Sequence, residues 1–465
     1  MVKKNSQINR IMLAGTGSGC GKTTVTCALL KALSDKGLKP ISFKCGPDYI
    51  DPMFHSEILG TKSRNLDLFL CGENTVKYLL ADAMEELEGS AGGTGYAVIE
   101  GVMGMYDGLG FEDDSFSANH ISRVTGTPQV LVTGVKGKSR SLLAELSGYL
   151  NFGPNHVKGV ILNHCSKAMY PVYKKMIEEN LPVRVYGYLP PIKEAEIGSR
   201  HLGLVTAEEV SDLREKMEAL GKAAASSLDL EGLLKLSESA PPLEYEEISL
   251  RGVSRQPVPV AVARDKAFCF YYEDNFKLLR KLGVQPVPFS PLHDERLPEG
   301  VCGLILGGGY PEEYLKQLSE NKQMLRAVRK AAAAGMPVYA ECGGFMYLGN
   351  SITRGEKTYE MAGVLSGNSH MTEGLVRFGY KTLKANRDNL LCKAGEEIRC
   401  HEFHYSDTDC YGDGFTAVKG ARTWLTVEAG ETLYAGYPHL HLWSNIAFAE
   451  NFVRACSRFR QGAGV

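Results

Sequence analysis

The chain has 465 residues, more than a single hydrophobic core usually serves, so we expect two or three domains. Its formal charge of −2 provides no basic field, which argues against nucleic acid or an anionic membrane as the main partner. The twelve cysteines include no CxxC pair, and this pattern fits free thiols in a reducing cytoplasm better than a disulfide framework.

Strands and helices are predicted to alternate over the first part of the chain. The N-terminus, MVKKNSQINRIMLAG, carries only a short apolar run, so it predicts a strand at 11–14 and not a signal peptide. A helix is expected from Lys22, with Gly37 as a cap after its last turn. This alternation predicts an α/β fold with a mostly parallel sheet covered on both faces. Further strands are predicted at 40–45, 96–100, 129–134, 157–163 and 183–190.

A change of composition follows. Charged helical pieces and then SESAPPLEYEEISLRGVSRQP indicate a domain boundary, with domains at 1–245 and 257–465 and a linker at 246–256. Short alternating segments between 374 and 442 predict a partly antiparallel edge before a final helix, and no apolar stretch is long enough to span a bilayer. Apolar strands of the second domain are predicted at 257–265, 284–289, 301–309 and 336–342.

The stretch GTGSGCGKTT (15–24) lies between the first strand and the first helix. A glycine-rich loop in this position can wrap phosphates, because backbone N–H groups and the helix N-terminus point toward them. Lys22 is expected to reach the terminal phosphates of ATP, and the hydroxyl of Thr23 to bind Mg²⁺. The spacing departs by one residue from GxxxxGK[ST], and the loop lacks the second lysine of partition-type ATPases. The expected ATP-binding residues are Thr16, Gly17, Gly19, Gly21, Lys22, Thr23, Thr24 and Asn163, the last as a reader of the adenine edge or a loop cap.

Two acidic segments follow strands of the same predicted sheet. Asp48 and Asp51 come after the second strand, Glu100 ends the third, and Asp107 lies in the next loop. Ligands of open α/β sheets bind beyond the carboxyl ends of the strands, so we expect these carboxylates on the phosphate side. Asp48 and Glu100 are predicted to bind Mg²⁺ together with Thr23. Solvated loop carboxylates or helix caps are the alternative.

The stretch YAECGGFMYLG (339–349) ends a strand on Cys342 and continues at once with two glycines. A cysteine on such a strand-to-helix turn is lifted out of the sheet and can act as a nucleophile, with a buried structural cysteine as the alternative. His439 or His441, two positions apart near the C-terminus, is expected as its base. The N–H groups of an oxyanion hole are expected from Gly308, Gly309 and Gly343.

Several of these motifs together resemble a known group of enzymes. GGGYPE, YAECGGFMYLG and YPHLHLW are similar to the class I glutamine amidotransferase domain of the cobyrinic and cobyric acid synthase group. GTGSGCGKTT, FKCGPDYIDP, RNLDLFL and IEGVMGMYDG are similar to the dethiobiotin-synthetase-like ATPase domain of the same group. With SRHLGLV (199–205) and HEFHYS (401–406), the resemblance covers essentially the whole chain and is strongest to the a,c-diamide synthases.

The resemblance implies an enzyme of cobalamin biosynthesis that amidates the a and c carboxylates of cobyrinic acid, using ATP, Mg²⁺ and glutamine. It implies that Cys342 releases ammonia from glutamine through a thioester, and that the substrate carboxylate becomes an acyl phosphate before ammonia attacks it. The segment 401–404 is expected either to face the macrocycle or to be structural, and the oligomeric state stays open, a homodimer included. Positions implied to handle the substrate or the phosphorylated intermediate are Tyr49, Ile50, Asp51 and Asp107.

The chain departs from the pattern of many triad glutaminases at one position. Those enzymes end in His-x-Glu, whereas this chain has His439, Leu440 and His441. A dyad of Cys342 and His439 is therefore expected, without an assigned third member.

Three alternatives remain. Nickel-sirohydrochlorin a,c-diamide synthase carries nearly the same motifs, and cobyric acid synthase shares both domains but generally differs around the second acidic motif. A partition-like ATPase acting as an interaction module is the alternative from another class. The missing lysine and the fused glutaminase argue against it.

Overall fold

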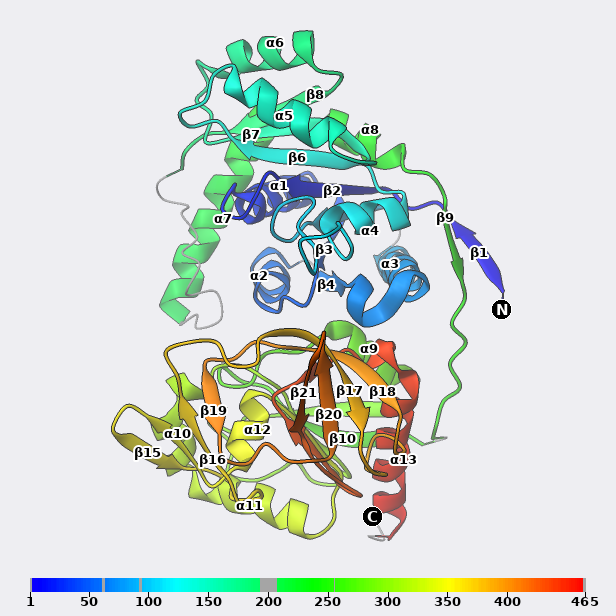
Figure 1. Cartoon of the computed structure of the whole chain (residues 1–465), viewed down its shortest axis with the longest axis vertical. Helices are drawn as coiled ribbons and strands as arrows, with labels where there is room; N and C mark the ends of the chain where they lie inside the picture. Colours follow the sequence, from blue (N-terminus) through cyan, green and yellow to red (C-terminus); the bar gives the residue numbers. More distant parts are fainter. Residues whose placement is uncertain (1, 61–62, 92–93, 193–206, 255, 463–465) are drawn as a thin grey trace. The chain divides into compact units, whose positions relative to one another are not determined.

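A computed structural model describes residues 2–60, 63–91, 94–192, 207–254 and 256–462 (Figure 1). The chain forms two compact units, Met1–Ile248 and Ser249–Val465, and each is described here by itself. The segment SRHLGLV lies outside the described residues.

The first unit contains the predicted parallel sheet, with seven strands that all pair in parallel. The predicted strands are confirmed, and β4 is added at one edge. In spatial order the strands are β4 (Ser63–Leu66), β3 (Lys39–Cys45), β5 (Gly95–Glu100), β2 (Arg10–Gly15), β6 (Gln129–Gly134), β7 (Val157–Asn163) and β8 (Arg184–Leu189).

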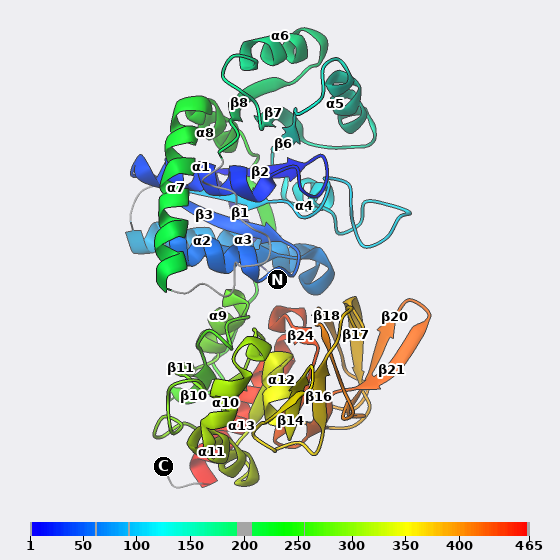
Figure 2. The same cartoon turned by 90° about the vertical axis from the view of Figure 1, so that its left-hand side faces the viewer.

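Helices cover both faces of this sheet (Figure 2). One core lies between the sheet and the helices α1, α7 and α8, and another lies under α5 and α6. Helix α1 ends as expected, because Gly37 has φ 76° and its N–H donates to the carbonyl oxygen of Ser34. The helices are α1 (Lys22–Asp35), α2 (Ile50–Leu59), α3 (Leu68–Ala91), α4 (Ala118–Thr125), α5 (Ser141–Asn151), α6 (Tyr170–Asn180), α7 (Ala207–Ser227) and α8 (Leu230–Glu238).

A small antiparallel sheet of two strands also belongs to the first unit. It joins β1 (Lys3–Ser6) to β9 (Leu243–Glu246), so the start of the chain pairs with the end of the unit. Sequence analysis did not predict these strands, because each has only four residues and is stabilised by a partner far away in the chain.

The second unit is built around a six-stranded sheet, which is parallel except for its edge strand β22. Its strands, in spatial order, are β11 (Val284–Phe289), β10 (Val258–Ala263), β12 (Leu304–Leu306), β13 (Val338–Glu341), β23 (Leu433–Gly436) and β22 (Glu428–Gly430). Helices α9 (Glu273–Lys281) and α13 (Ile446–Gly462) pack on one face. The other face is covered by α10 (Leu315–Glu320), α11 (Lys322–Ala333) and α12 (Gly343–Leu348).

The short alternating segments form more than the expected antiparallel edge. Most of those outside the six-stranded sheet pair with one another in a five-stranded sheet, whereas Ser406–Thr408 pairs with an earlier strand in a four-stranded sheet. The five-stranded sheet contains β21 (Arg422–Thr426), β20 (Phe415–Lys419), β17 (Gly379–Ala385), β18 (Glu397–Glu402) and β24 (His439–Leu440). The four-stranded sheet contains β15 (Lys357–Glu360), β14 (Ser351–Arg354), β16 (Asn368–Met371) and β19 (Ser406–Thr408).

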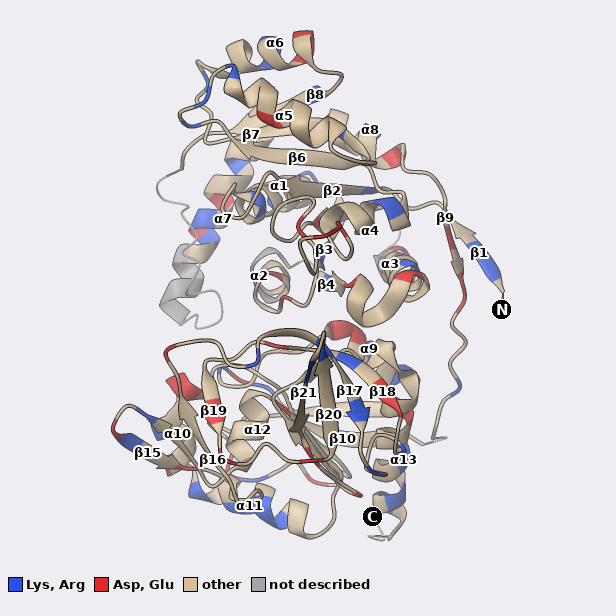
Figure 3. Ribbon diagram, viewed as in Figure 1, with Lys and Arg blue, Asp and Glu red and all other residues tan. Residues whose placement is uncertain are grey.

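Positive and negative side chains are interspersed along the elements of both units (Figure 3). Among the described helices, none combines the length and the apolar character needed to cross a bilayer. The twelve cysteines all belong to the described residues and are free thiols, as expected.

Candidate active sites

The loop between β2 and α1 folds around the ammonium group of Lys22. Its Nζ donates to the carbonyl oxygen of Gly17 at 3.1 Å and to that of Met103. Burial lowers the pKa of Lys22 below its ordinary value. Positive φ angles at Gly19 and Gly21 allow the loop to turn sharply before the helix begins. Lys22 is thus held across the loop at the carboxyl edge of the sheet, where a phosphate-binding lysine is expected.

Asn163 supports this loop from the end of β7. Its Nδ2 donates to the carbonyl oxygen of Cys20 at 3.0 Å, and a Cβ on Gly21 would meet that nitrogen at 1.9 Å. The carbonyl oxygen of Thr16 accepts a hydrogen bond from the hydroxyl of Tyr149. These contacts give Asn163 a bracing role, and its contact with adenine stays a prediction.

A second lysine, Lys44, lies among the predicted acidic residues. Its Nζ is 2.7 Å from Oε1 of Glu100, 2.6 Å from Oδ2 of Asp51 and 4.0 Å from Oδ2 of Asp48. The parallel pairing of β3 with β5 places Lys44 directly opposite Glu100. Sequence analysis missed Lys44. A lysine inside the apolar run PISFKC indicates a buried ammonium group, which needs an acidic partner within the sheet.

These contacts set the protonation of the cluster. Burial alone would lower the pKa of Lys44, but the carboxylates of Glu100, Asp51 and Asp48 outweigh it and raise that pKa above its ordinary value. Burial raises the pKa of Asp48 to about 6, and the negative charge of Asp51 acts in the same direction. Burial also disfavours the charge on Asp51, but Lys44 dominates and holds its pKa below the ordinary value. Lys44 and Asp51 therefore form a charged pair at neutral pH.

The remaining predicted residues of this site stabilise their own loops. Oδ1 of Asp48 accepts a hydrogen bond from the N–H of Ile50 at 2.8 Å, and this contact stabilises the start of α2. Tyr49 precedes Ile50 and is 8% exposed. Oδ2 of Asp107 accepts a hydrogen bond from the N–H of Gly104 at 2.7 Å. Asp107 thus stabilises the loop that follows β5, and its charge acts on Lys22, as that of Glu100 does.

The oxygen donors beside the P-loop suit a magnesium ion. In nucleotide sites Mg²⁺ usually binds one or two carboxylates together with phosphate and water oxygens. The hydroxyl of Thr23 lies 2.6 Å from Oε1 of Glu100 and 3.4 Å from Oδ2 of Asp51. Among the described residues, no three His, Cys, Asp or Glu side chains are placed to hold a metal on their own. The donor set therefore fits an ion that shares its coordination with ATP. Asp51 lies beside Thr23 and Glu100, and the binding of Mg²⁺ by Asp48 stays a prediction.

In the second unit, Cys342 stands on a strained turn between β13 and α12. Its φ of 46° and ψ of −106° lie in a region that residues other than glycine rarely adopt. The N–H of Cys342 donates to the carbonyl oxygen of Gly436 at 2.8 Å, and that of Gly344 to the carbonyl oxygen of Gly307 at 2.9 Å. A Cβ on Gly344 would meet the carbonyl oxygen of Leu306 at 2.2 Å, so only glycine fits there. This geometry is that of a nucleophile presented at the end of a strand.

His439 connects Cys342 to a carboxylate. The side chain of His439 is hydrogen-bonded to Cys342, and its Nδ1 lies 3.4 Å from Oε2 of Glu341. Burial alone would lower the pKa of His439, but Cys342 and Glu341 outweigh it and raise that pKa to about 10. His439 therefore carries a proton at neutral pH, which it can give to a leaving group. Glu341 was missed in the sequence, because nothing in the chain order indicates which way the side chain before the nucleophile points.

The glycine loop after β12 lies against the same imidazole. A Cβ on Gly308 would stand 2.5 Å from Cε1 of His439, and a Cβ on Gly343 would stand 3.4 Å from the backbone nitrogen of Gly309. The loop and the nucleophile turn therefore meet beside His439, which is the arrangement that a two-donor oxyanion hole requires. The donation of these N–H groups to an oxyanion stays a prediction.

Three further histidines are packed in the interior of this unit. His441 is fully buried and packs against Tyr272, with the ring centroids 4.8 Å apart and the rings tilted by 38°, and burial lowers its pKa to about 3. His404 stacks on Tyr437 at 3.7 Å, and its Nδ1 lies 2.8 Å from the carbonyl oxygen of Ser406. Burial lowers the pKa of His401 to about 3 as well. These contacts favour the structural alternative for the segment 401–404.

Comparison with known proteins places both units in described families. Residues 11–205 match the model of the CobQ/CobB/MinD/ParA nucleotide binding domain. Residues 259–446 match the model of the CobB/CobQ-like glutamine amidotransferase domain.

Curated relatives match almost the entire chain. The cobyrinate a,c-diamide synthase of Clostridium tetani is 39% identical over 94% of this chain and 98% of its own. The enzyme of that name from Fusobacterium nucleatum is 40% identical over 94% of this chain and 98% of its own. The one from Listeria monocytogenes (strain EGD-e) is 38% identical over 97% of this chain and the whole of its own. The chain therefore belongs to the cobyrinate a,c-diamide synthase family.

Proposed function

We propose that this chain converts the a and c carboxylates of cobyrinic acid to amides in cobalamin biosynthesis, with glutamine as nitrogen donor and ATP as the source of energy. Membership of the family makes the chain an ATP-dependent amidoligase that uses glutamine. The observation that carries the proposal is the pair of sites in one chain. One site contains Cys342 on a strained turn, hydrogen-bonded to His439. The other contains the buried ion pair of Lys44 and Glu100 beside a P-loop.

The second unit releases ammonia. Cys342 attacks the side-chain amide carbon of glutamine, and His439 gives its proton to the departing nitrogen. The N–H groups of Gly309 and Gly343 would stabilise the negative oxygen of the tetrahedral intermediate. Water then hydrolyses the thioester and releases glutamate.

Arg377 is the group we assign to the α-carboxylate of glutamine. Its Nη1 is buried and has no hydrogen-bond partner within the described part of the chain, and its guanidinium lies 3.4 Å from the ring centre of Tyr411. Tyr437 interacts electrostatically with both Arg377 and Cys342, so the two residues lie on the same side of this unit's site. A buried guanidinium nitrogen without a hydrogen-bond partner destabilises the fold, and a carboxylate bound by two parallel hydrogen bonds is the ligand that arginine prefers.

The first unit activates the substrate carboxylate. That carboxylate attacks the γ-phosphate of ATP, ADP leaves, and the resulting acyl phosphate reacts with ammonia to give the amide and phosphate. Lys22 holds the transferred phosphate, and Lys44 offers a second positive charge near Asp51 and Glu100. Thr23, Glu100 and Asp51 would hold Mg²⁺, which neutralises charge on the phosphates when bound.

Mass spectrometry of candidate macrocycles tests this function. The protein is incubated with ATP, MgCl₂ and glutamine, and cobyrinic acid is expected to gain two amides. Two amides on nickel sirohydrochlorin but none on cobyrinic acid would favour that alternative substrate. Amidation of the other peripheral carboxylates of the a,c-diamide would favour cobyric acid synthase. ATP hydrolysis without amidation of any macrocycle contradicts the proposal.

A further inference from the structure

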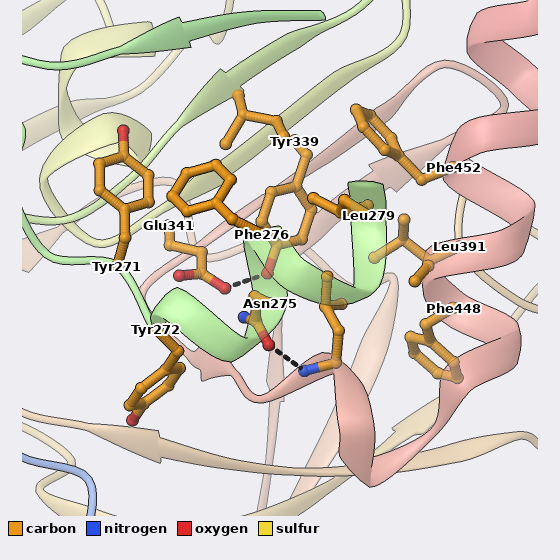
Figure 4. Close-up of a pocket in the computed structure, with 13 residues that line it drawn as sticks. Tyr271, Tyr272, Asn275, Phe276, Leu279, Tyr339, Glu341, Leu391, Phe448 and Phe452 are labelled. Atoms are coloured by element: carbon orange, nitrogen blue, oxygen red, sulfur yellow. Dashed lines mark hydrogen bonds between the residues drawn. The ribbon is translucent and has the colours of Figure 1, made fainter. Parts of the chain in front are cut away.

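The strand that ends at the nucleophile presents neighbouring side chains to opposite faces of the sheet. Val338, Ala340 and Cys342 belong to the core on the side of α10, α11 and α12. Tyr339 and Glu341 point to the side of α9 and α13, because successive strand residues alternate (Figure 4). A side chain beyond the strand end is needed to touch both Cys342 and Glu341.

His439 is that side chain. It begins β24, where its Cα pairs with that of His401 of β18. It is hydrogen-bonded to Cys342, and its Nδ1 faces Oε2 of Glu341 at 3.4 Å. The next residue fixes the same carboxylate, because the N–H of Leu440 donates to Oε1 of Glu341 at 2.8 Å.

The carboxylate of Glu341 is held in place on its other side as well. The hydroxyl of Tyr339 donates to Oε1, so this oxygen has two donors while Oε2 faces the imidazole. Glu341 is 5% exposed and borders a cavity of about 30 Å³, lined by apolar side chains that include Phe276, Leu279 and Phe448 (Figure 4). In such surroundings a carboxylate acts on a neighbouring imidazolium far more strongly than it would in water.

We propose that Glu341 is a positioning residue for His439 and completes a triad with Cys342, so that the residue before the nucleophile replaces the glutamate of His-x-Glu. The position two residues after His439 is occupied by His441, which packs on Tyr272 and carries no negative charge. The inference rests on the glutaminase half-reaction of the proposed function. It names the group that orients the base and stabilises its proton.

Glu341→Gln keeps the length of the side chain and removes the negative charge. We expect the kcat for glutamine hydrolysis to fall at least about 10-fold, as expected for an impaired acid–base group. Amidation with ammonium chloride should stay within about 2-fold of wild type, because it bypasses Cys342. The pH profile is the decisive readout. Without Glu341, the proton of His439 is lost at lower pH, so the alkaline decline of kcat/KM for glutamine should shift to lower pH.

Two variants control for structural effects. Tyr339→Phe removes one donor to Oε1 but leaves the charge of Oε2 facing His439, so we expect a smaller loss of kcat and a smaller shift of the pH profile than with Glu341→Gln. Glu341→Asp keeps the charge at a greater distance, and it should recover part of the kcat and part of the alkaline decline. If Glu341→Gln does not fold, the pH profile of Glu341→Asp is the test. A wild-type profile in that variant would overturn the inference.

A Glu341→Gln enzyme with wild-type kcat and pH profile also overturns it. Equal losses with glutamine and with ammonia would do the same, because they show a structural role. These outcomes differ from a failure of the proposed function. In that case the wild-type protein would not hydrolyse glutamine, or its rate would be no higher than that of Cys342→Ser.

Discussion

Lys44 and Glu100 form an ion pair inside the parallel sheet of the first unit. Their Cα atoms are partners in the pairing of β3 with β5, and Nζ of Lys44 lies 2.7 Å from Oε1 of Glu100. Both side chains are nearly inaccessible to solvent, and Asp51 and Thr23 contact the same pair. The pair therefore belongs both to the interior of the sheet and to the cluster beside the P-loop, so a change of either residue should affect stability and activity together.

Replacement of Lys44 by methionine should affect both properties. The change leaves buried carboxylates without their cation, so the free energy of unfolding should fall by about 3 kcal/mol in urea titrations. Amidation should be lost with glutamine and with ammonia. Lys31→Met breaks the more exposed pair with Asp35 on α1, and it should lower the free energy of unfolding by less than about 1 kcal/mol. A Lys44→Met enzyme that retains more than about a tenth of its ammonia-dependent activity would exclude Lys44 from the chemistry.

Cys342→Ser should abolish amidation with glutamine and leave amidation with ammonia largely intact. The thiol serves only to release ammonia, and a hydroxyl at this position is a much weaker nucleophile. Cys410→Ser, at a partly exposed thiol of the same unit, should behave as wild type. Initial rates with each nitrogen source check this division. Failure of ammonia to rescue a folded Cys342→Ser protein would show that the two half-reactions are not separable.

Glu100→Gln and Asp107→Asn should separate metal binding from the chemical step. Glu100 contacts Thr23 in the donor set for Mg²⁺, so its change should weaken Mg²⁺–ATP and depress amidation with either nitrogen source. The carboxylate of Asp107 accepts a hydrogen bond from the N–H of Gly104 in its own loop, and asparagine can accept that bond too. Asp107→Asn should therefore leave ATP affinity nearly unchanged while it lowers kcat. Calorimetry of nucleotide binding beside single-turnover amidation distinguishes the two, and equal losses of affinity would place Asp107 in the metal site.

Arg377→Ala should raise the KM for glutamine by at least about 10-fold, because the α-carboxylate loses a charged hydrogen-bond donor. Amidation with ammonia should be unaffected. Arg387→Ala, which removes the exposed ion pair with Asp413, is the matched control. An unchanged KM for glutamine in a folded Arg377→Ala enzyme would assign the guanidinium to packing on Tyr411 instead.

His441 should make the protein less stable in acid. Its pKa is about 3 in the folded chain, whereas an exposed histidine has a pKa of about 6.5. Between these values the unfolded chain binds the additional proton, so the free energy of unfolding falls as pH decreases from about 6.5 toward 3. His441→Phe keeps the ring beside Tyr272 and should reduce the loss between pH 7 and 4.5 in urea titrations, whereas the surface change His293→Phe should not. An equal acid loss in His441→Phe and wild type would contradict this assignment.

Local patterns in the chain were enough to predict the α/β fold, most strands of both main sheets, the P-loop and the turn that carries Cys342. Each depends on a short run of residues. Apolar segments of strand length predict strands whatever their partners are. The glycines around Lys22 and after Cys342 indicate sharp turns, because only glycine adopts such backbone angles easily. The position of Asp51 and Glu100 after their strands also followed from chain order, because parallel strands end at one edge of the sheet.

Contacts between distant segments decided the rest. Lys44 became a site residue only when β3 paired with β5 in a register that placed it opposite Glu100. Glu341 became the partner of His439 because strand alternation turned it away from Cys342, and because a segment almost a hundred residues later returned to the strand end. Most short strands after α12 formed two further sheets for the same reason, while β22 and β23 joined the six-stranded sheet. Strand partners and side-chain neighbours are set by packing across the whole unit, which no local spacing along the chain encodes.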